Sequence, residues 1–273
     1  MKTFDQKPLI IAHRGASAHS PENTFAAFQR AIEAGADGIE FDVRLAKDVV
    51  PIVFHDATLI RLAKDKRRVA DLTGEELNRI DVGSWFNRAF STRADARFST
   101  ETIPTLEQLL DFLSDYPGLI YLELKSAESS FPVLTEAVCH LLRQTALLPQ
   151  IIVKSFNLNA VKLAKQLLPE IRTAALFEPK VLTVLRKKRH ILAEAQSCGA
   201  DELSLHYSLA TKRFVRQAIE NNFPVTIWTA DNPAWIERAL NYKINAIITN
   251  DPARLLARRE EVLRKNGVPS EIE

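Results

Sequence analysis

The chain has 273 residues, of which 46% are hydrophobic and 26% charged. This composition is typical of a globular protein with a sizeable core and argues against a disordered chain or a membrane bundle. The formal net charge is only +2, so the sequence lacks the basic excess that binds many nucleic-acid phosphates. The N-terminal region has too short an apolar run for a signal peptide or a membrane span. With only Cys139 and Cys198, both expected to be reduced thiols, we expect a cytoplasmic protein.

Short apolar runs alternate with amphipathic stretches along nearly the whole chain, which is the pattern of βα units around a parallel sheet. Eight of the runs are each followed by a helical pattern, and one further run is left over. The eight units predict a (β/α)₈ TIM barrel, a fold that normally occupies about 250 residues as one domain. We therefore expect a single domain over residues 1–273. The nine candidate strands are residues 9–14, 38–43, 50–55, 119–125, 151–156, 172–177, 202–206, 225–230 and 246–250.

The surplus strand is explained if the second and third runs form a β-hairpin. A two-residue turn at Lys47 and Asp48 pairs Ala46 with Val49. Counting outward along the antiparallel strands then pairs Glu40 with His55. The hairpin thus removes one strand from the barrel count and is expected to bring His55 beside Glu40.

Residues 57–103 interrupt the alternation, because they are polar, rich in turn formers and too long for an ordinary loop. We expect an insertion at about these residues that caps the mouth of the barrel. Its basic run, residues 61–68, could attract phosphate, but such runs are more often a solvated surface. The chain ends in a last helical pattern followed by a polar tail.

Acidic residues lie near the ends of two predicted strands, where barrel enzymes place their functional groups. Glu40 and Asp42 are two residues apart and therefore share one face of their strand, as do Glu123 and Lys125. Neighbouring buried carboxylates require a compensating cation. Three carboxylates without a cysteine cluster favour a hard ion, Mg²⁺ or Ca²⁺. The alternative is ordinary ion pairing with basic residues of the barrel: Arg14, Arg44 and Lys125.

His13 and His55 each end a predicted strand. Two imidazoles near a metal can divide the proton transfers of phosphodiester cleavage, because both titrate near neutral pH. A single histidine in such a place would more often be structural. The presence of two, flanking a carboxylate pair, favours a catalytic role.

Three further residues suit a phosphodiester substrate. Arg14 can bind a phosphate oxygen in bidentate fashion, and Lys125 can add a point charge. Trp228 could form an apolar wall for an alcohol, although a strand tryptophan is more often part of a core. In the stretch after the first strand, Ser20 is expected to cap a helix whose first turn contains Pro21.

The whole pattern resembles the glycerophosphodiester phosphodiesterase family. The resemblance rests on IAHRGASAHSPENTFAAFQRAIEAGADGIEFDVRLAKDVVPIVFHD, followed in order by LTGEELNRIDVGSWF, IPTLEQLLDFL, YLELK, KSFN, VTIWTADNPAWIERAL and AIITNDP. It covers most of residues 9–255. The chain departs from the family in the hairpin turn, where Ala46 and Val49 stand in place of the usual Thr and Gly. Because a β-branched residue resists positive φ, we expect a different turn geometry there.

The resemblance implies a TIM barrel with a small inserted cap, a divalent cation and hydrolysis of small glycerophosphodiesters to sn-glycerol 3-phosphate and an alcohol. It also implies roles for individual residues. Two alternatives stay open: a non-catalytic barrel that binds glycerophosphate-like ligands, and a lysophospholipase D-type phosphodiesterase. The implied assignments are metal ligation by Glu40, Asp42 and Glu123, acid–base catalysis by His13 and His55, and phosphate binding by Arg14 and Lys125.

Overall fold

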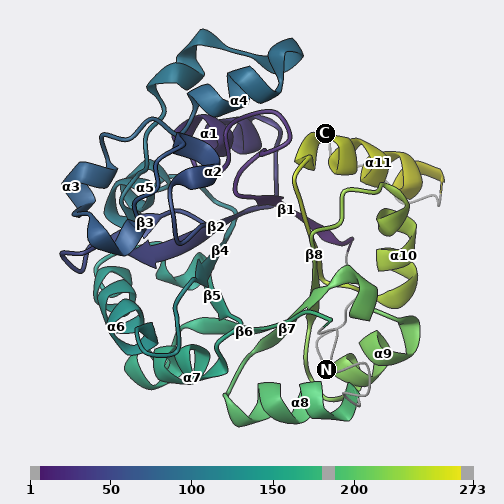
Figure 1. Ribbon diagram of the computed structural model, residues 1–273. Helices are drawn as coiled ribbons and strands as arrows, with labels where there is room; N and C mark the ends of the chain where they lie inside the picture. The colour runs from purple at the N-terminus through teal and green to yellow at the C-terminus, as the bar shows by residue number, and fades with distance from the viewer. Residues whose placement is uncertain (1–6, 180–187, 266–273) are drawn as a thin grey trace.

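Residues 7–179 and 188–265 are described by the computed structural model, and they form a closed barrel of eight parallel strands surrounded by helices (Figure 1). The strands are β1 (Leu9–His13), β2 (Gly38–Leu45), β3 (Pro51–Val53), β4 (Leu119–Leu124), β5 (Ile151–Ser155), β6 (Arg172–Phe177), β7 (Glu202–His206), β8 (Val225–Trp228) and β9 (Ala246–Thr249). Their order is β1-β9-β8-β7-β6-β5-β4-β2-β3, and pairing of β1 with β2 closes the barrel. The predicted strands and the TIM-barrel fold are therefore confirmed.

Helices follow the barrel strands, as the alternating pattern predicts. They are α1 (Phe25–Glu33), α2 (Ile60–Ala63), α3 (Gly74–Leu77), α4 (Ser84–Ala89), α5 (Leu106–Phe112), α6 (Phe131–Leu142), α7 (Leu158–Leu167), α8 (Lys188–Ser197), α9 (Lys212–Glu220), α10 (Ala234–Tyr242) and α11 (Pro252–Lys265). The last helical pattern is thus α11, whereas the tail expected after it lies outside the described residues. Within the described chain, no helix combines the length and the apolar character needed to cross a lipid bilayer.

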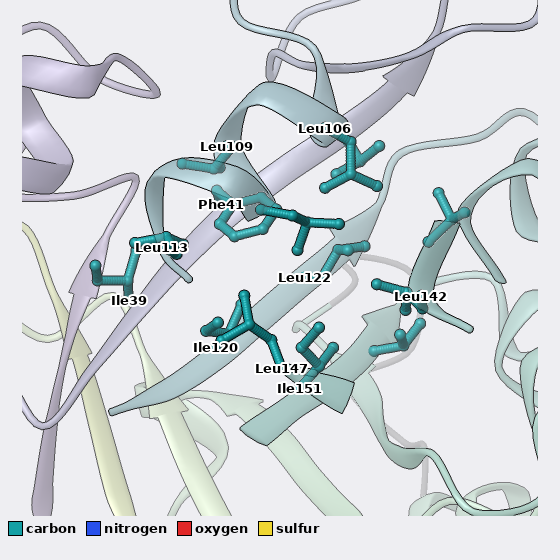
Figure 2. Close-up of a cluster of buried hydrophobic side chains, with 14 of the residues drawn as sticks. Ile39, Phe41, Leu106, Leu109, Leu113, Ile120, Leu122, Leu142, Leu147 and Ile151 are labelled. Carbon is teal, nitrogen blue, oxygen red and sulfur yellow. The ribbon is translucent and has the colours of Figure 1, made fainter. Parts of the chain in front are cut away.

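The outer faces of the strands pack against the helices and build the main core. Ile39 and Phe41 of β2 are fully buried together with Leu106 and Leu109 of α5 (Figure 2). Since side chains alternate along a strand, burying Ile39 and Phe41 outward turns Glu40 toward the barrel axis. The hydrophobic effect on the outer face therefore fixes which residues line the interior.

The hairpin forms, but its register differs by one residue from the prediction. Val43 pairs with Val53, and Ala46 donates a 2.9 Å backbone hydrogen bond to Val50. The predicted pairs of Ala46 with Val49 and of Glu40 with His55 are therefore wrong. The cause is the turn, in which Val49 takes a positive φ of 66° and adds a third residue to the loop. His55 lies beyond the end of β3, in the connection that leaves the hairpin.

Replacing Val49 by glycine is expected to stabilise the protein. A left-handed conformation costs an L-residue roughly 1–2 kcal/mol, and Val49 is exposed, so its side chain gives up little packing. Allowing for the greater freedom of glycine in the unfolded chain, we expect a gain of about 1 kcal/mol, or a rise in Tm of about 2–4 °C. Thermal unfolding measures this rise in Tm. The matched control is Lys47→Gly in the same turn, which is expected to destabilise; equal effects of the two changes would contradict the explanation.

The polar segment 57–103 folds into α2, α3, α4 and short 3₁₀ turns beside β3. Its buried residues pack into a separate apolar cluster with the hairpin, which includes Ile52, Phe54, Leu59, Leu62, Leu72, Leu77, Val82 and Ile103. Arg93 donates a hydrogen bond to the carbonyl of Ala18, in the loop after β1. In the basic run, Arg67 forms an ion pair with Asp65. Part of the charge of this run is thus already neutralised within the segment.

Candidate active site

The loop after β1 aims Arg14 back at the barrel. Arg14 and Gly15 both have positive φ, of 54° and 77°. A Cβ atom on Gly15 would lie 2.5 Å from the backbone of Ala27, so this sharp turn requires glycine. The turn places Nε of Arg14 at 3.0 Å from Oδ2 of Asp42. The backbone N–H of Arg14 also donates a 3.2 Å hydrogen bond to Oε2 of Glu40.

The helix after this loop begins later than predicted. Thr24, not Ser20, is the N-cap, and the first helical residue is Phe25. Asn23 has a left-handed φ of 58°, so the chain turns just before the N-cap. Pro21 therefore lies outside the helix. Asn23 is buried, and its Nδ2 donates a 3.0 Å hydrogen bond to Oδ2 of Asp42. The sequence pattern did not predict this contact, because a helix cap is a sufficient explanation for the polar residues of this segment.

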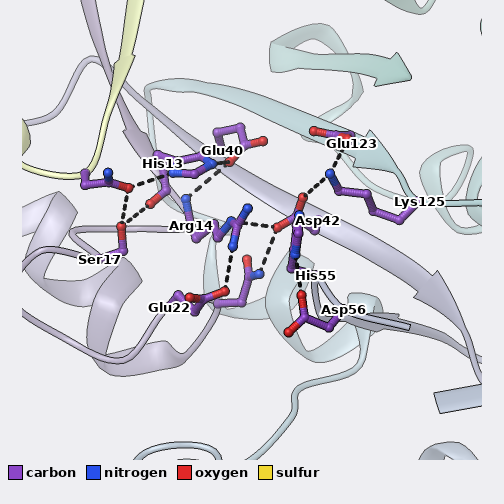
Figure 3. Close-up of polar contacts among 12 residues, drawn as sticks. His13, Arg14, Ser17, Glu22, Glu40, Asp42, His55, Asp56, Glu123 and Lys125 are labelled. Atoms are coloured by element: carbon purple, nitrogen blue, oxygen red, sulfur yellow. Dashed lines mark hydrogen bonds and ion pairs between the residues drawn. The ribbon is translucent and has the colours of Figure 1, made fainter. Parts of the chain in front are cut away.

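The three predicted carboxylates converge inside the barrel. Asp42 of β2 stands opposite Glu123 of the neighbouring strand β4, and Glu40 lies two residues before Asp42. All three are buried, and one oxygen from each lies within 4.8 Å of the others. The strand registers thus bring three acidic groups to one point, and Figure 3 shows them with their partners.

Two lysines lie against this carboxylate cluster. Nζ of Lys125 is 2.5 Å from Oε1 of Glu123 and 3.3 Å from Oδ1 of Asp42. Nζ of Lys154, on β5, is 2.7 Å from Oε1 of Glu40 and 3.8 Å from Oε2 of Glu123. Arg14 and Lys125 therefore form the ion pairs that the alternative predicted.

Arg44, the remaining basic residue in that alternative, directs two of its donors to backbone carbonyls. Its Nε donates a 2.6 Å hydrogen bond to the carbonyl of His55, and Nη1 donates to the carbonyl of Lys125 at 3.3 Å. Among the described residues, the pairing of Arg44 with Glu40 or Asp42 that the alternative allowed is not formed, because these backbone groups take its donors. Arg44 instead ties the chain beyond β3 to the end of β4.

Lys154 was not among the residues that the sequence singled out. Only 1% of it is exposed, and β5 places it opposite Glu123 of β4. The run IIVKSF did contain a signal, because a lysine inside a buried strand requires an anionic partner. Reading that signal would have added a fourth residue to the predicted cluster.

The surroundings shift the pKa values of Asp42 and Glu123 in opposite directions. Burial works to raise the pKa of Asp42, but Arg14 and Lys125 outweigh it and hold this pKa far below its usual range. Burial raises the pKa of Glu123 more than its two lysines lower it. Asp42 is therefore a permanent anion at neutral pH, while Glu123 accepts a proton more readily.

The three carboxylates form a ligand set that fits a hard divalent cation. Within the described part of the chain, one buried oxygen of each carboxylate accepts no hydrogen bond of suitable geometry, although a lysine ammonium group lies nearby. Mg²⁺ and Ca²⁺ both prefer such oxygen ligands. Glu40, Asp42 and Glu123 are the residues that could hold the ion.

Each of the two histidines is held through Nδ1. His13 Nδ1 lies 2.7 Å from Oδ1 of Asn250, and His55 Nδ1 lies 2.6 Å from Oδ1 of Asp56. Nε2 of His13 is 3.9 Å from Oε2 of Glu40, beside the carboxylate cluster. Burial lowers the pKa of both histidines below the usual value, against the opposing effect of nearby carboxylates. The neutral form of each imidazole is therefore favoured at pH 7. Nε2 is then the ring nitrogen that is available for proton transfer.

One arginine outside the barrel supports this arrangement. Arg61 of α2 lies 2.6 Å from both Oε2 of Glu22 and Oδ2 of Asp56. Glu22 in turn accepts a 2.7 Å hydrogen bond from Arg14, and Asp56 contacts His55. This chain of contacts links Arg61, in the segment after the hairpin, to both Arg14 and His55.

Trp228 lies among aromatic rings near the ends of β5, β7 and β8. Its ring packs edge-on against Phe156 and His206, with centroids 5.5 and 5.4 Å apart. Phe156 is 39% exposed, and Nζ of Lys125 lies 5.7 Å from the centre of its ring. An aromatic surface therefore adjoins the charged cluster, and Trp228 belongs to it rather than to the carboxylate cluster itself.

Comparisons with known proteins agree on one family. A sequence model of the glycerophosphoryl diester phosphodiesterase family matches residues 13–254. A glycerophosphodiester phosphodiesterase of Caldanaerobacter subterraneus subsp. tengcongensis is 32% identical over 263 residues, covering 96% of this chain and 100% of that protein. Another from Bacillus subtilis is 30% identical over 252 residues, covering 89% of this chain and 84% of that protein.

Solved structures have the same fold. An Oleispira antarctica phosphodiesterase in complex with the product sn-glycerol-3-phosphate is 27% identical, with a TM-score of 0.81 and coverage of 93% of this chain and 97% of that one. A putative glycerophosphoryl diester phosphodiesterase from Silicibacter pomeroyi is 25% identical, with a TM-score of 0.82 and coverage of 96% and 95%. The similarity thus spans the barrel and its inserted segment.

Proposed function

Since the chain belongs to the glycerophosphoryl diester phosphodiesterase family, we propose that it hydrolyses glycerophosphodiesters to sn-glycerol 3-phosphate and an alcohol, using a divalent cation and two histidines. That it is a phosphodiesterase follows from the family and the enzymes within it. The resemblance found in the sequence is thereby confirmed. Membership disfavours the alternative of a non-catalytic barrel.

The observation that carries the proposal is the convergence of Glu40, Asp42 and Glu123 beside His13. These carboxylates would hold Mg²⁺ or Ca²⁺, and the ion would neutralise charge that develops on the phosphoryl oxygens. Arg14, at the edge of the cluster, adds a fork of donors suited to phosphate oxygens. The acidic and basic groups together suit an anion with a single phosphate group.

The two histidines divide the proton transfers. One removes a proton from the nucleophile, and the other donates a proton to the departing alcohol. The nucleophile is either water or the substrate's own glycerol hydroxyl, in which case a cyclic phosphate forms and is opened by water. Lys125 supplies a point charge to the phosphate, and Trp228 with Phe156 forms the apolar wall for the alcohol.

Removing divalent cations is expected to abolish turnover of glycerophosphocholine. Loss of charge neutralisation costs several kcal/mol of transition-state stabilisation, so we expect a fall in kcat of about 100-fold or more. Choline release, followed after exhaustive chelation and after adding back Mg²⁺ or Ca²⁺, measures it. The control is chelator saturated with the same metal before use. Undiminished turnover in the chelated protein would contradict metal dependence, and binding without turnover in the metal-loaded protein would support the non-catalytic alternative.

A further inference from the structure

A chain of hydrogen bonds runs behind His13, away from the carboxylate cluster. Nδ1 of His13 lies 2.7 Å from Oδ1 of Asn250, and Nδ2 of Asn250 donates a 2.7 Å hydrogen bond to Oδ2 of Asp231. Asp231 follows β8, and Asn250 follows the adjacent strand β9. The other carboxylate oxygen of Asp231 accepts 2.8 Å hydrogen bonds from the backbone N–H of Asn250 and from Oγ1 of Thr249. Asp231 is thus fixed by several contacts.

The direction of each hydrogen bond in this chain is determined by chemistry. An ionised carboxylate only accepts, so the amide of Asn250 must present its NH₂ group to Asp231 and its oxygen to His13. The amide oxygen also only accepts, so Nδ1 of His13 must carry the proton. A neutral imidazole has a single N–H, which leaves the lone pair on Nε2.

We propose that Asp231, acting through Asn250, is a positioning residue that fixes the tautomer of His13. With the proton held on Nδ1, Nε2 faces the reaction as an acceptor. The inverted amide would place its oxygen 2.7 Å from Oδ2 of Asp231, acceptor against acceptor. The inverted amide would also place its NH₂ group at His13 and move the imidazole proton to Nε2.

The two histidines are therefore oriented by different means. His55 donates directly to the carboxylate of Asp56, whereas the carboxylate that orients His13 lies one amide further away. A neutral partner orients the ring of His13 without placing a second negative charge against it. The catalytic part of the proposal rests on the proposed function, because it takes His13 as a proton-transfer residue; the tautomer itself does not.

The test is the isosteric change Asp231→Asn. It keeps an oxygen for Thr249 and the backbone of Asn250, but turns an NH₂ group toward the NH₂ group of Asn250. Relief of that clash by inversion of the Asn250 amide is expected to shift the His13 proton to Nε2. Nitrogen-15 NMR of the metal-free protein, with His13 assigned by comparison with His13→Gln, reports which ring nitrogen is protonated. We expect a fall in kcat of about 10²–10⁴-fold, the size seen when an Asp→Asn change reverses a catalytic histidine's tautomer.

The swapped double variant Asp231→Asn/Asn250→Asp is the sharper test. The new amide can donate to the new carboxylate, whose second oxygen again accepts from Nδ1 of His13. We expect the tautomer to return, and turnover to recover in part, because the swap also brings a negative charge directly against His13. The matched control is Asp201→Asn at the opposite end of the barrel, where Asp201 likewise accepts from a backbone N–H and a threonine hydroxyl.

The outcomes separate this inference from the proposed function. A proton that stays on Nδ1 in Asp231→Asn overturns the inference, as does a double variant that fails to restore the tautomer. A reversed tautomer with undiminished turnover supports the role of Asp231 in fixing the ring but contradicts the use of His13 Nε2 in catalysis. A reversed tautomer with lost turnover, rescued by the swap, supports both.

Discussion

Replacing His13 or His55 by alanine is expected to lower kcat for glycerophosphocholine by about 10²–10⁴-fold, the usual contribution of a positioned general acid or base. Each residue presents Nε2 while its Nδ1 is held by a side chain behind it. The imidazole therefore has a defined position from which alanine can neither accept nor donate a proton. Steady-state kinetics with saturating metal measure the fall in kcat. Thermal unfolding of each variant shows whether the fold is retained.

The matched control for these variants is His19→Ala. His19 lies in the loop after β1, near the same end of the barrel, and its Nε2 lies 3.2 Å from Oδ2 of Asp251 rather than beside the carboxylate cluster. We expect its kcat to stay within about twofold of that of the unchanged enzyme, because a partly exposed contact of this kind contributes about 1 kcal/mol or less. A double variant of His13 and His55 that remains active would overturn the acid–base assignment.

Replacing Lys154 by methionine is expected to lower the free energy of unfolding of the metal-free protein by about 3–5 kcal/mol. Removing one member of a buried ion pair leaves its partner uncompensated, and here Glu40 is the partner, with Glu123 next to it. Urea unfolding in the presence of chelator measures the loss. The size of the effect follows from burial, because no water reaches Glu40 to replace the ammonium group.

Lys165→Met provides the matched comparison. Lys165 also pairs with an acidic residue, Asp201, at 2.8 Å, but both side chains are partly exposed. We expect a loss of about 1 kcal/mol or less there, since solvent screens the pair. Adding Mg²⁺ or Ca²⁺ should stabilise Lys154→Met more than the unchanged protein, because binding to the folded state adds stability by mass action and the lysine no longer competes. Equal unfolding free energies for the two variants would contradict the structural role of Lys154.

The sequence predicted the barrel because its signals are local. Alternation of apolar runs with helical patterns identified all nine strands, and the two-residue spacing of Glu40 and Asp42 placed them on one face. The end of its strand indicated Glu123, and the register of β2 with β4 in the structure sets it opposite Asp42. Strand periodicity and the rule that functional groups lie at the carboxyl ends of barrel strands indicated these positions, whereas their roles as metal ligands came from the family resemblance.

The remaining parts of the site depend on turn conformation and on neighbours distant in sequence. The hairpin register was missed by one residue because Val49 adopts a positive φ that its side chain disfavours. The contact of Asn23 with Asp42 joins two elements through a left-handed residue that no periodic pattern marks. Asn250 lies 237 residues from His13 along the chain, so only the closed barrel brings them together. Periodicity predicts elements, whereas these contacts are created by the way the elements meet.

The position of Arg61 has a consequence for how this enzyme can evolve. This residue is at the start of the inserted segment, and it contacts both Glu22, the partner of Arg14, and Asp56, the partner of His55. Insertions or deletions before residue 61 would displace it and disturb both contacts together. We therefore expect changes in length that the protein tolerates within this segment to lie after residue 61.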